Sequence, residues 1–310
     1  MAAFAASPRI GLGTSRLGAD GTREDAYALL DAFVDLGGSL IDTAAVYSDW
    51  IPGERGRSET VIGEWLALRG SRNKVRISTK GAHPPLDDMS HGRLDAASIR
   101  HDVEQSLRRL RTDYVDLYLL HRDDPKVPVA DIFGELGRFI SQGKIGAVGV
   151  SNWDVSRIAQ ARTMTPAPVA NQVLGNILCT TMNPPGDTTI RVLNGSYFRQ
   201  AVSEDLALML FSSQCRGAFL PAKRGHVPPD YDNLATLLVI AEIVAVADDV
   251  RIDAADLVIA FLRQVSPRII PLIGPQNVAQ LTRSMQALDV QLDAATVARL
   301  TAISGFDAFA

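Results

Sequence analysis

Three apolar segments of the chain each lead into an ionisable side chain, a pattern that places reactive groups at the ends of predicted strands. These side chains are Asp42, Lys80 and His121, and Tyr47 follows the first of them by five residues. If the segments are neighbouring parallel strands, their carboxyl ends share one rim, where catalytic groups collect in a barrel of alternating strands and helices. We therefore expect the tetrad of Asp42, Tyr47, Lys80 and His121 to converge on one pocket.

Together these four residue types could deliver a proton to a developing alkoxide. A tyrosine hydroxyl has an ordinary pKa of about 10, and we expect the Lys80 ammonium to favour the phenolate and to lower the pKa of Tyr47. Asp42 would keep the ammonium charged and oriented, and His121 could hydrogen-bond the tyrosine or the reacting oxygen. Such a tyrosine could protonate a carbonyl oxygen as the carbon receives hydride. Taken singly, each residue also has an ordinary structural explanation in a turn, a loop or the core.

Eight short apolar segments alternate with helix-like segments along the chain. They are continuously apolar rather than alternating, which is typical of strands covered on both faces. Strand–helix alternation indicates a parallel sheet with helices outside, and eight units in 310 residues favour a single-domain α/β protein, a (β/α)8 TIM barrel over residues 1–310. The predicted strands are Ile10–Thr14, Leu40–Asp42, Val75–Lys80, Val115–His121, Ile145–Val150, Val169–Val173, Leu206–Phe211 and Ile269–Ile273.

Helix starts and long connections complete the predicted architecture. Thr22 with Asp25 predicts a capping box before an apolar stripe at helical spacing, and Asn277 predicts an N-cap near the carboxyl end of the chain. Long connections follow strand ends, so we expect them to overhang the same rim and to build a substrate pocket. These connections are Thr43–Arg57, Gly81–Leu94, Arg122–Pro128 and Gly175–Asp187.

Composition narrows the class of protein. The formal net charge is -4 and hydrophobic residues make up 46%, which suits a sizeable core and gives no reason to expect nucleic acid or a membrane as partner. The alanine-rich start, residues 1–8, lacks a basic region and a long apolar stretch, so a signal peptide is not expected. The longest apolar stretch, residues 234–247, is interrupted by Glu242 and is too short for a bilayer. We predict a cytoplasmic protein with two reduced cysteines.

Several motifs, in order along nearly the whole chain, resemble the signature of the aldo-keto reductase family. They are Ile41-Asp42-Thr43-Ala44-Ala45-Val46-Tyr47 with Gly56-Arg57-Ser58-Glu59, Ser78-Thr79-Lys80, Asp113–His121, and Gly143-Lys144-Ile145 leading to Gly149-Val150-Ser151-Asn152. The resemblance implies a (β/α)8 barrel enzyme that reduces aldehydes or ketones, or oxidises alcohols, with a nicotinamide cofactor. It also implies that Tyr47 is the general acid and that the rest of the tetrad supports it.

The resemblance further implies a set of cofactor-binding residues. Ser151, Asn152 and Gln172 match positions that bind the nicotinamide carboxamide, a group that needs both donors and acceptors. Asn152 could also cap the helix that begins near Asp154. Phe211 matches an aromatic position that stacks on the nicotinamide ring, although a core phenylalanine is the alternative. The remaining residues expected at the cofactor are Gly13, Thr14, Asp42, Ser212, Ser213, Gln214, Arg216, Gly274, Gln276, Asn277 and Gln280.

The segment after the last strand departs from the family pattern. Relatives often have an arginine at the position of Gln276 or of Gln280, where it pairs with the ribose 2′-phosphate of NADPH. Both positions are neutral here, which weakens discrimination for NADP over NAD, although Arg283 or Arg216 could compensate. We predict NADPH as the cofactor, with NADH as the alternative.

The substrate is expected to be a small-molecule carbonyl compound. Arg122 could bind an anionic or hydroxylated substrate, or could form an ion pair with Asp123 or Asp124. The oligomeric state is predicted only as a monomer or a small homo-oligomer. The residues expected to line the pocket from the rim loops are Trp50, His83, Arg122 and Trp153.

Two other functions compete with the reductase. One is a nicotinamide-binding, redox-sensing subunit with little turnover, which would need a partner protein. The other is a metal-dependent barrel hydrolase, which would need clustered histidine and carboxylate ligands. The five histidines are scattered and supply no evident metal site.

Overall fold

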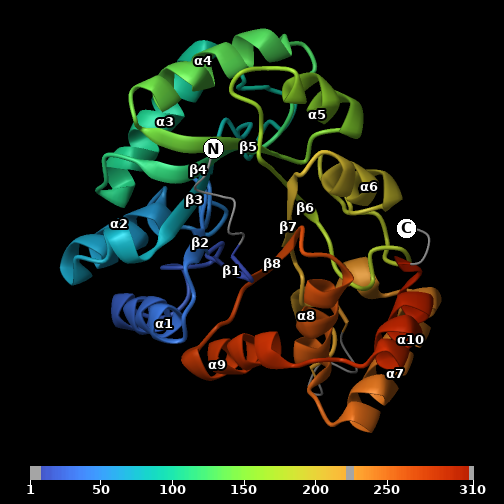
Figure 1. The fold of residues 1–310 in the computed structure, drawn as a ribbon. Coiled ribbons are helices and arrows are strands. Elements are labelled where there is room, and N and C mark those ends of the chain that lie inside the picture. The colour runs from blue at the N-terminus through green and yellow to red at the C-terminus, as the bar shows by residue number, and fades with distance from the viewer. Residues whose placement is uncertain (1–7, 221–226, 307–310) are drawn as a thin grey trace.

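A closed ring of parallel strands forms the centre of the protein, and helices surround it (Figure 1). The computed structural model describes residues 8–220 and 227–306, and within these residues eight strands follow one another around the barrel in chain order. The first strand closes the ring by pairing with the last, with Gly11 opposite Leu272. The predicted (β/α)8 fold is therefore confirmed. Residues 1–7, which belong to the start discussed above, lie outside the described residues.

The strands match the predicted segments to within one residue at either end, because each is a short apolar run that ends at a polar or turn residue. They are β1 (Gly11–Gly13), β2 (Leu40–Asp42), β3 (Arg76–Gly81), β4 (Val115–Leu120), β5 (Ile145–Ser151), β6 (Ala170–Leu174), β7 (Ala207–Phe211) and β8 (Ile269–Ile273).

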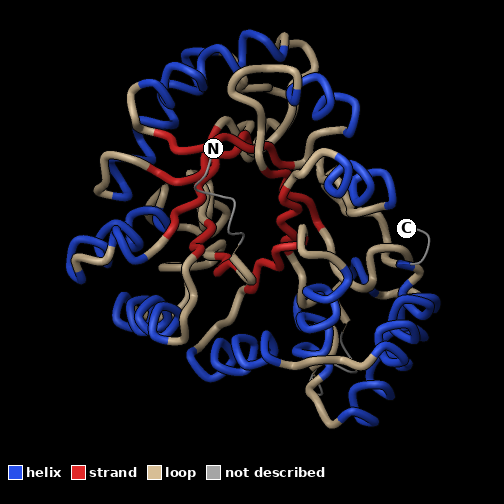
Figure 2. The backbone as a smooth tube through the Cα atoms, in the orientation of Figure 1, coloured by secondary structure: helices blue, strands red, loops and turns tan. Residues whose placement is uncertain are grey.

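Helices fill the connections and form the outer layer, as the blue tubes around the red strands show in Figure 2. In the described residues one α-helix separates each pair of strands up to β7, two lie between β7 and β8, and two follow β8. The helices are α1 (Arg23–Asp35), α2 (Arg57–Arg69), α3 (Ala96–Leu110), α4 (Val129–Ser141), α5 (Val155–Arg162), α6 (Gly195–Ser203), α7 (Leu234–Val250), α8 (Ala254–Val265), α9 (Val278–Gln286) and α10 (Ala294–Ser304).

The alternation of side chains along each strand decides which residues face the barrel interior. Leu40 of β2 and Leu119 of β4 belong to a small core cluster separate from the one that packs strands against helices. Successive strand side chains point to opposite faces, so residues two positions further along face the same way. Asp42 therefore lies above Leu40 and His121 above Leu119, at the carboxyl rim of the barrel.

Both predicted helix caps are present. Thr22 and Asp25 form a reciprocal capping box at the start of α1, and the Asn277 side chain accepts a hydrogen bond from the backbone N–H of Gln280 at the start of α9. These bonds satisfy backbone N–H groups that lack partners within the first turn of a helix. The cap on α9 places that helix directly after β8, beside the rim.

The Gly-Arg-Ser-Glu motif joins α2 to the barrel rather than contributing a reactive group. Ser58 Oγ donates to the Thr14 carbonyl oxygen at 2.9 Å. Glu59 is fully buried, and its carboxylate accepts hydrogen bonds from Thr79 Oγ1 and from Arg109 Nε, the latter at 2.7 Å. A buried carboxylate is stable only when it is paired in this way. The motif thus ties α2 to β1, β3 and α3, close to the rim.

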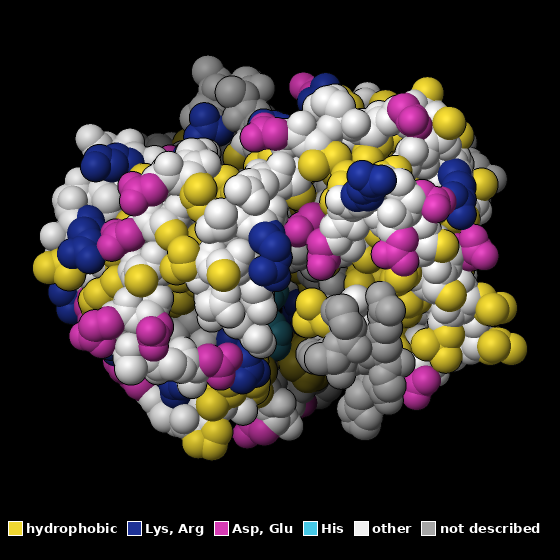
Figure 3. Space-filling model, turned by 90° about the horizontal axis from the view of Figure 1, so that it is seen from below, with side chains coloured by type: hydrophobic (Ala, Val, Ile, Leu, Met, Phe, Trp, Pro, Cys, Tyr) yellow, Lys and Arg dark blue, Asp and Glu magenta, His cyan; other side chains and the backbone are white. Residues whose placement is uncertain are grey.

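The surface carries both signs of charge. Figure 3 shows lysine and arginine side chains interspersed with aspartate and glutamate over the face seen from below. Across residues 8–220 and 227–306, no helix is both long enough and apolar enough to cross a membrane. The most apolar helix, α7, has 17 residues.

Candidate active site

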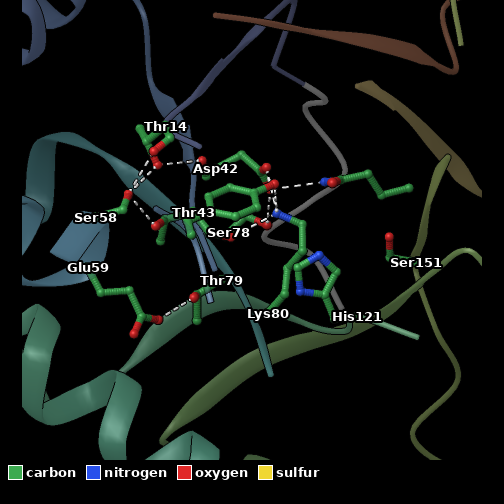
Figure 4. Close-up of polar contacts among 12 residues, drawn as sticks. Thr14, Asp42, Thr43, Ser58, Glu59, Ser78, Thr79, Lys80, His121 and Ser151 are labelled. Atoms are coloured by element: carbon green, nitrogen blue, oxygen red, sulfur yellow. Dashed lines mark hydrogen bonds and ion pairs between the residues drawn. The ribbon is translucent and has the colours of Figure 1, made fainter. Parts of the chain in front are cut away.

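Three residues of the tetrad, Asp42, Lys80 and His121, come together at the carboxyl ends of β2, β3 and β4 (Figure 4). Asp42 is the last residue of β2, Lys80 lies near the end of β3, and His121 directly follows β4. Tyr47 reaches the same place from the loop after β2. Asp42 and Lys80 are 1% and 0% exposed, whereas Tyr47 is half-buried and lines a cavity. The predicted convergence of the four side chains is thus what the structure shows.

Lys80 makes three hydrogen bonds, which use all the donors of its ammonium group. Its Nζ lies 2.7 Å from Asp42 Oδ2 and 2.8 Å from the carbonyl oxygen of Thr43. The third donor points at Tyr47 Oη, 3.0 Å away. The second carboxylate oxygen, Asp42 Oδ1, accepts from Gln172 Nε2 at 3.0 Å. Because the ammonium donates to the phenol oxygen, the hydrogen of the Tyr47 hydroxyl is available to a further acceptor.

Burial decides the pKa of the tyrosine. It raises the pKa of Tyr47, and the Lys80 ammonium offsets this only in part because the Asp42 carboxylate behind it acts in the opposite direction. The expectation of a lowered tyrosine pKa is therefore wrong. Burial alone would lower the pKa of Lys80, but Asp42 and Tyr47 together raise it. At neutral pH the tyrosine is protonated and the lysine is charged.

His121 is a neutral ring beside the tyrosine. Burial, followed by the neighbouring His83 and Arg122, lowers the pKa of His121 well below its ordinary value. The His121 ring centroid lies 5.9 Å from that of Tyr47, edge-on. Its Nδ1 is buried and has no hydrogen-bond partner among the described residues. A neutral imidazole keeps one N–H, so His121 can donate to an oxygen bound next to the tyrosine.

A cavity of about 820 Å³ extends over the rim from the tetrad to α9. This volume is in the range of ligand and cofactor sites. The loops after β2, β3, β4 and β6 line its tetrad end through Trp50, His83, Arg122 and Asp187 respectively. The predicted overhang of the long connections is therefore present.

Most of the residues predicted to bind the cofactor line this cavity. They come from the ends of β1, β2, β5, β6, β7 and β8 and from the segments after them. The lining residues among those predicted are Gly13, Asp42, Ser151, Asn152, Gln172, Phe211, Ser212, Ser213, Gln214, Arg216, Gly274, Gln276 and Gln280.

Besides Lys80, which is fully buried behind Tyr47, three of the predicted site residues do not line the cavity. Trp153 is fully buried, and its ring packs edge-on against Phe133 of α4 at 6.1 Å, so its prediction as a pocket residue is wrong. Asn152, directly before it, takes a φ of 60°, in the left-handed region. Thr14 Oγ1 donates to the Asp42 carbonyl oxygen, and Asn277 caps α9, so both act behind the cavity wall.

Asn152 uses its amide inside the protein. Its Nδ2 donates to Ser151 Oγ at 2.9 Å, and its Oδ1 accepts from the backbone N–H of Arg191 at 3.0 Å. It does not cap α5, whose N-cap residue is Asp154. Because Ser151 Oγ accepts the bond from Asn152, its hydroxyl hydrogen can be donated into the cavity.

Arg122 is nearly buried and bridges two rim loops. Its Nη1 donates to the His121 carbonyl oxygen at 2.9 Å, its Nε to Thr189 Oγ1 at 2.8 Å, and its Nη2 to Asp187 Oδ2 at 3.1 Å. The alternative considered for Arg122, an ion pair with Asp123 or Asp124, is absent from the described contacts, and Asp123 pairs with Arg157. The Arg122 guanidinium therefore lies at the cavity wall and holds the loop after β6 over the cavity.

The far end of the cavity contains two aspartates that were not predicted there. Asp253 and Asp256 line it from the start of α8, and burial followed by the charge of Asp253 raises the pKa of Asp256 to about 6. Arg283 of α9 lines the same end, whereas Arg216 forms an ion pair with Asp230 at 2.7 Å.

The cavity wall has the chemistry that a nicotinamide dinucleotide requires. The Ser151 hydroxyl and the Gln172 amide stand beside the tetrad, where a carboxamide needs donors and acceptors. Gly274 leaves open space, since a Cβ added there would meet no other atom within 4 Å. Arg283, and Arg216 in its ion pair with Asp230, lie toward the other end, where their guanidinium groups would meet phosphates. These residues fit such a group.

Comparison with known proteins agrees with this geometry. The aldo-keto reductase YhdN of Bacillus subtilis is 32% identical over 213 residues, which cover 67% of this chain and 59% of YhdN, so less than two thirds of that relative is matched. The norsolorinic acid reductase stcV of Emericella nidulans is 29% identical and covers 88% of this chain and 70% of the relative. A 6-dehydroglucose reductase of Agrobacterium fabrum is 28% identical, with 93% and 91% covered.

Two solved structures of aldo/keto reductases from Klebsiella pneumoniae share the fold at 25% identity and cover 96% of this chain and 91% of their own. One, a complex with NADP and acetate, has a TM-score of 0.72, and the other, a complex with NADPH, has a TM-score of 0.73. The sequence profile of the Aldo/keto reductase family matches residues 9–304. With the fold, the tetrad and this match in agreement, the chain belongs to the aldo/keto reductase family.

Proposed function

We propose that this protein is an NADPH-dependent reductase of aldehydes or ketones, able to oxidise the corresponding alcohols, in which Tyr47 is the general acid. The observation that carries the proposal is the hydrogen bond from Lys80 Nζ to Tyr47 Oη at 3.0 Å, in a cavity-lining position. It leaves the tyrosine hydrogen available for a substrate oxygen. The bound cofactor would supply or accept the hydride.

Each member of the tetrad has a defined part in this proposal. Tyr47 donates its proton to the carbonyl oxygen, and Lys80 stabilises the phenolate that remains. Asp42 keeps the ammonium charged and in place through the 2.7 Å ion pair. His121, a neutral ring that keeps one N–H, donates that N–H to the same oxygen. Ser151 and Gln172 would hold the carboxamide of the cofactor.

NADPH is proposed as the cofactor because both Klebsiella structures contain NADP or NADPH and because Arg216 and Arg283 line the cavity. The relatives that act on norsolorinic acid and on 6-dehydroglucose suggest that the substrate is a small carbonyl compound. The cytoplasmic location and the monomer or small homo-oligomer remain predictions from the sequence.

The experiment that tests the proposal is a fluorescence titration of the purified protein with NADPH and NADH separately, followed by a panel of carbonyl compounds monitored at the absorbance of the reduced nicotinamide. We expect micromolar binding of NADPH and its oxidation by at least one carbonyl compound. Failure to bind either cofactor would contradict the proposal. Tight binding without turnover across the panel would favour the redox-sensing subunit.

A Gln276→Arg variant should bind NADPH more tightly relative to NADH than the wild type does. Gln276 lines the far end of the cavity. Its backbone N–H donates to Gln280 Oε1 at 2.8 Å, and this bond would hold the backbone of an arginine at the same position. A new ion pair with the 2′-phosphate should increase the ratio of the Kd for NADH to the Kd for NADPH by about 10-fold. Titration of both cofactors measures this ratio. An unchanged ratio would mean that the phosphate lies elsewhere.

The metal-dependent hydrolase gains no support from the site. Within the described ranges, 8–220 and 227–306, no group of three or more histidine, cysteine, aspartate or glutamate side chains is arranged to hold a metal ion. The tetrad instead pairs its carboxylate with an ammonium, which competes with a cation for Asp42.

A further inference from the structure

A second histidine stands beside the tetrad and has no part in the proton transfer described above. His83 follows β3 by two residues, is 9% exposed, and lines the cavity next to His121. The two imidazole rings meet edge-on with their centroids 4.7 Å apart. Because His121 would bind the carbonyl oxygen in the proposed function, a side chain in contact with His121 could reach a group bonded to the carbonyl carbon.

The protein sets the hydrogen-bonding role of His83. Its Nδ1 lies 2.6 Å from the Pro84 carbonyl oxygen, which can only accept, so Nδ1 carries the hydrogen. Burial, the largest cause, lowers the pKa of His83 to about 4, so the ring is neutral at physiological pH. Nε2 is then an unprotonated acceptor. It has no hydrogen-bond partner among the described residues, although Arg93 holds the His83 backbone through a bond to its carbonyl oxygen.

The neighbouring charged group supplies donors. The Arg122 guanidinium lines the same part of the cavity and lies close enough to influence the pKa of His83. Its Nη1 donates one N–H to the His121 carbonyl oxygen, and its Nη2 donates one N–H to Asp187. Each of these nitrogens has a second N–H. A substrate group here therefore meets one acceptor on His83 and donors on Arg122.

We propose that His83 and Arg122 recognise a hydroxyl group on the carbon next to the reacting carbonyl, so that the substrates are α-hydroxy aldehydes or ketones. The inference rests on the proposed reductase function. Among simple polar groups a hydroxyl both donates to His83 Nε2 and accepts from Arg122. A carboxylate could accept from Arg122 but would face the lone pair of His83 and the charge of Asp187. An ammonium could donate to His83 but would meet the positive guanidinium.

Hydroxyacetone and butanone test this recognition, because they have nearly the same size and differ by a hydroxyl in place of a methyl next to the carbonyl. The α-hydroxyl also changes the intrinsic reactivity of the ketone. The informative quantity is therefore the change, between wild type and variant, in the ratio of kcat/KM for the two ketones. We expect His83→Phe and His83→Leu to lower this ratio by about 10-fold, chiefly through KM for hydroxyacetone.

Two variants serve as controls. His83→Gln keeps a neutral acceptor, so its ratio of kcat/KM values should lie between those of the wild type and of His83→Phe. His91→Phe makes the same chemical change at an exposed histidine of the same loop, outside the cavity lining, and should leave the ratio unchanged. Titration with NADPH verifies that each variant keeps its cofactor site.

The outcomes separate the inference from the function on which it rests. A ratio that stays the same in His83→Phe and His83→Leu overturns the inference, and so does a wild-type enzyme that reduces butanone but not hydroxyacetone. Either result leaves the reductase function standing. A wild-type protein that reduces no ketone or aldehyde with NADPH or NADH removes the reductase function and the inference with it.

Discussion

A Tyr47→Phe variant should lose most of its carbonyl reduction while it binds NADPH almost as tightly as the wild type. The substitution removes only the hydroxyl that accepts from Lys80 at 3.0 Å and leaves the ring against Trp50 and His121. Loss of a positioned general acid lowers rates by about 100- to 10,000-fold. Steady-state rates with a reactive aldehyde, measured alongside a fluorescence titration with NADPH, provide the test.

Tyr27→Phe is the matched control for this variant. The Tyr27 hydroxyl donates to Glu64 at 3.1 Å, outside the cavity lining, so its loss should leave the rate unchanged. If Tyr47→Phe kept the wild-type rate, the proton-donor role would be wrong. The raised pKa of Tyr47 adds an expectation for the wild type. Reduction should persist through neutral pH and decline only as the pH rises above the ordinary tyrosine value of about 10.

A Lys80→Met variant should be impaired in both turnover and stability. The ammonium is fully buried between Asp42 and Tyr47, so its removal leaves the phenolate without a nearby positive charge. Turnover should fall by about 100-fold or more. The Asp42 carboxylate also loses its counter-charge while it remains buried. Breaking a buried pair from one side lowers the free energy of unfolding by about 3–5 kcal/mol.

Two comparisons separate these effects of Lys80→Met. The double variant Asp42→Asn, Lys80→Met removes both charges, so it should recover part of the lost stability but none of the turnover. Lys144→Met breaks the ion pair with Glu104, in which both side chains are about one third exposed, and should cost less than about 1 kcal/mol. Chemical denaturation, followed with the same spectroscopic probe throughout, measures the free energy of unfolding of all three variants. If Lys80→Met kept the stability and the rate of the wild type, the proposed roles of Lys80 in stability and in turnover would both be wrong.

The sequence determined the barrel and the convergence of the tetrad because both follow from local patterns. Each strand is an apolar run bounded by polar residues, and the period of two along a strand places Asp42 above Leu40 and His121 above Leu119. Parallel order then brings those ends to one rim. The caps of α1 and α9 follow in the same way from residues three positions apart. Each of these patterns can be read within a short segment, although the barrel itself closes by pairing β1 with β8.

Tertiary structure decided the partners of the side chains and the protonation of the site. Arg122 could be paired with its neighbours in sequence, yet it binds Asp187, 65 residues away, because the loop after β6 folds over the rim. Trp153 was expected in the pocket, but it is buried in the core, where it packs against Phe133 of α4.

Protonation depends even more on the fold, because it follows from burial and from charges brought together by distant strands. Those causes raise the pKa of Tyr47 and keep His83 and His121 neutral. The sequence alone therefore determined which groups could do the chemistry. The three-dimensional environment decided which proton each of them holds.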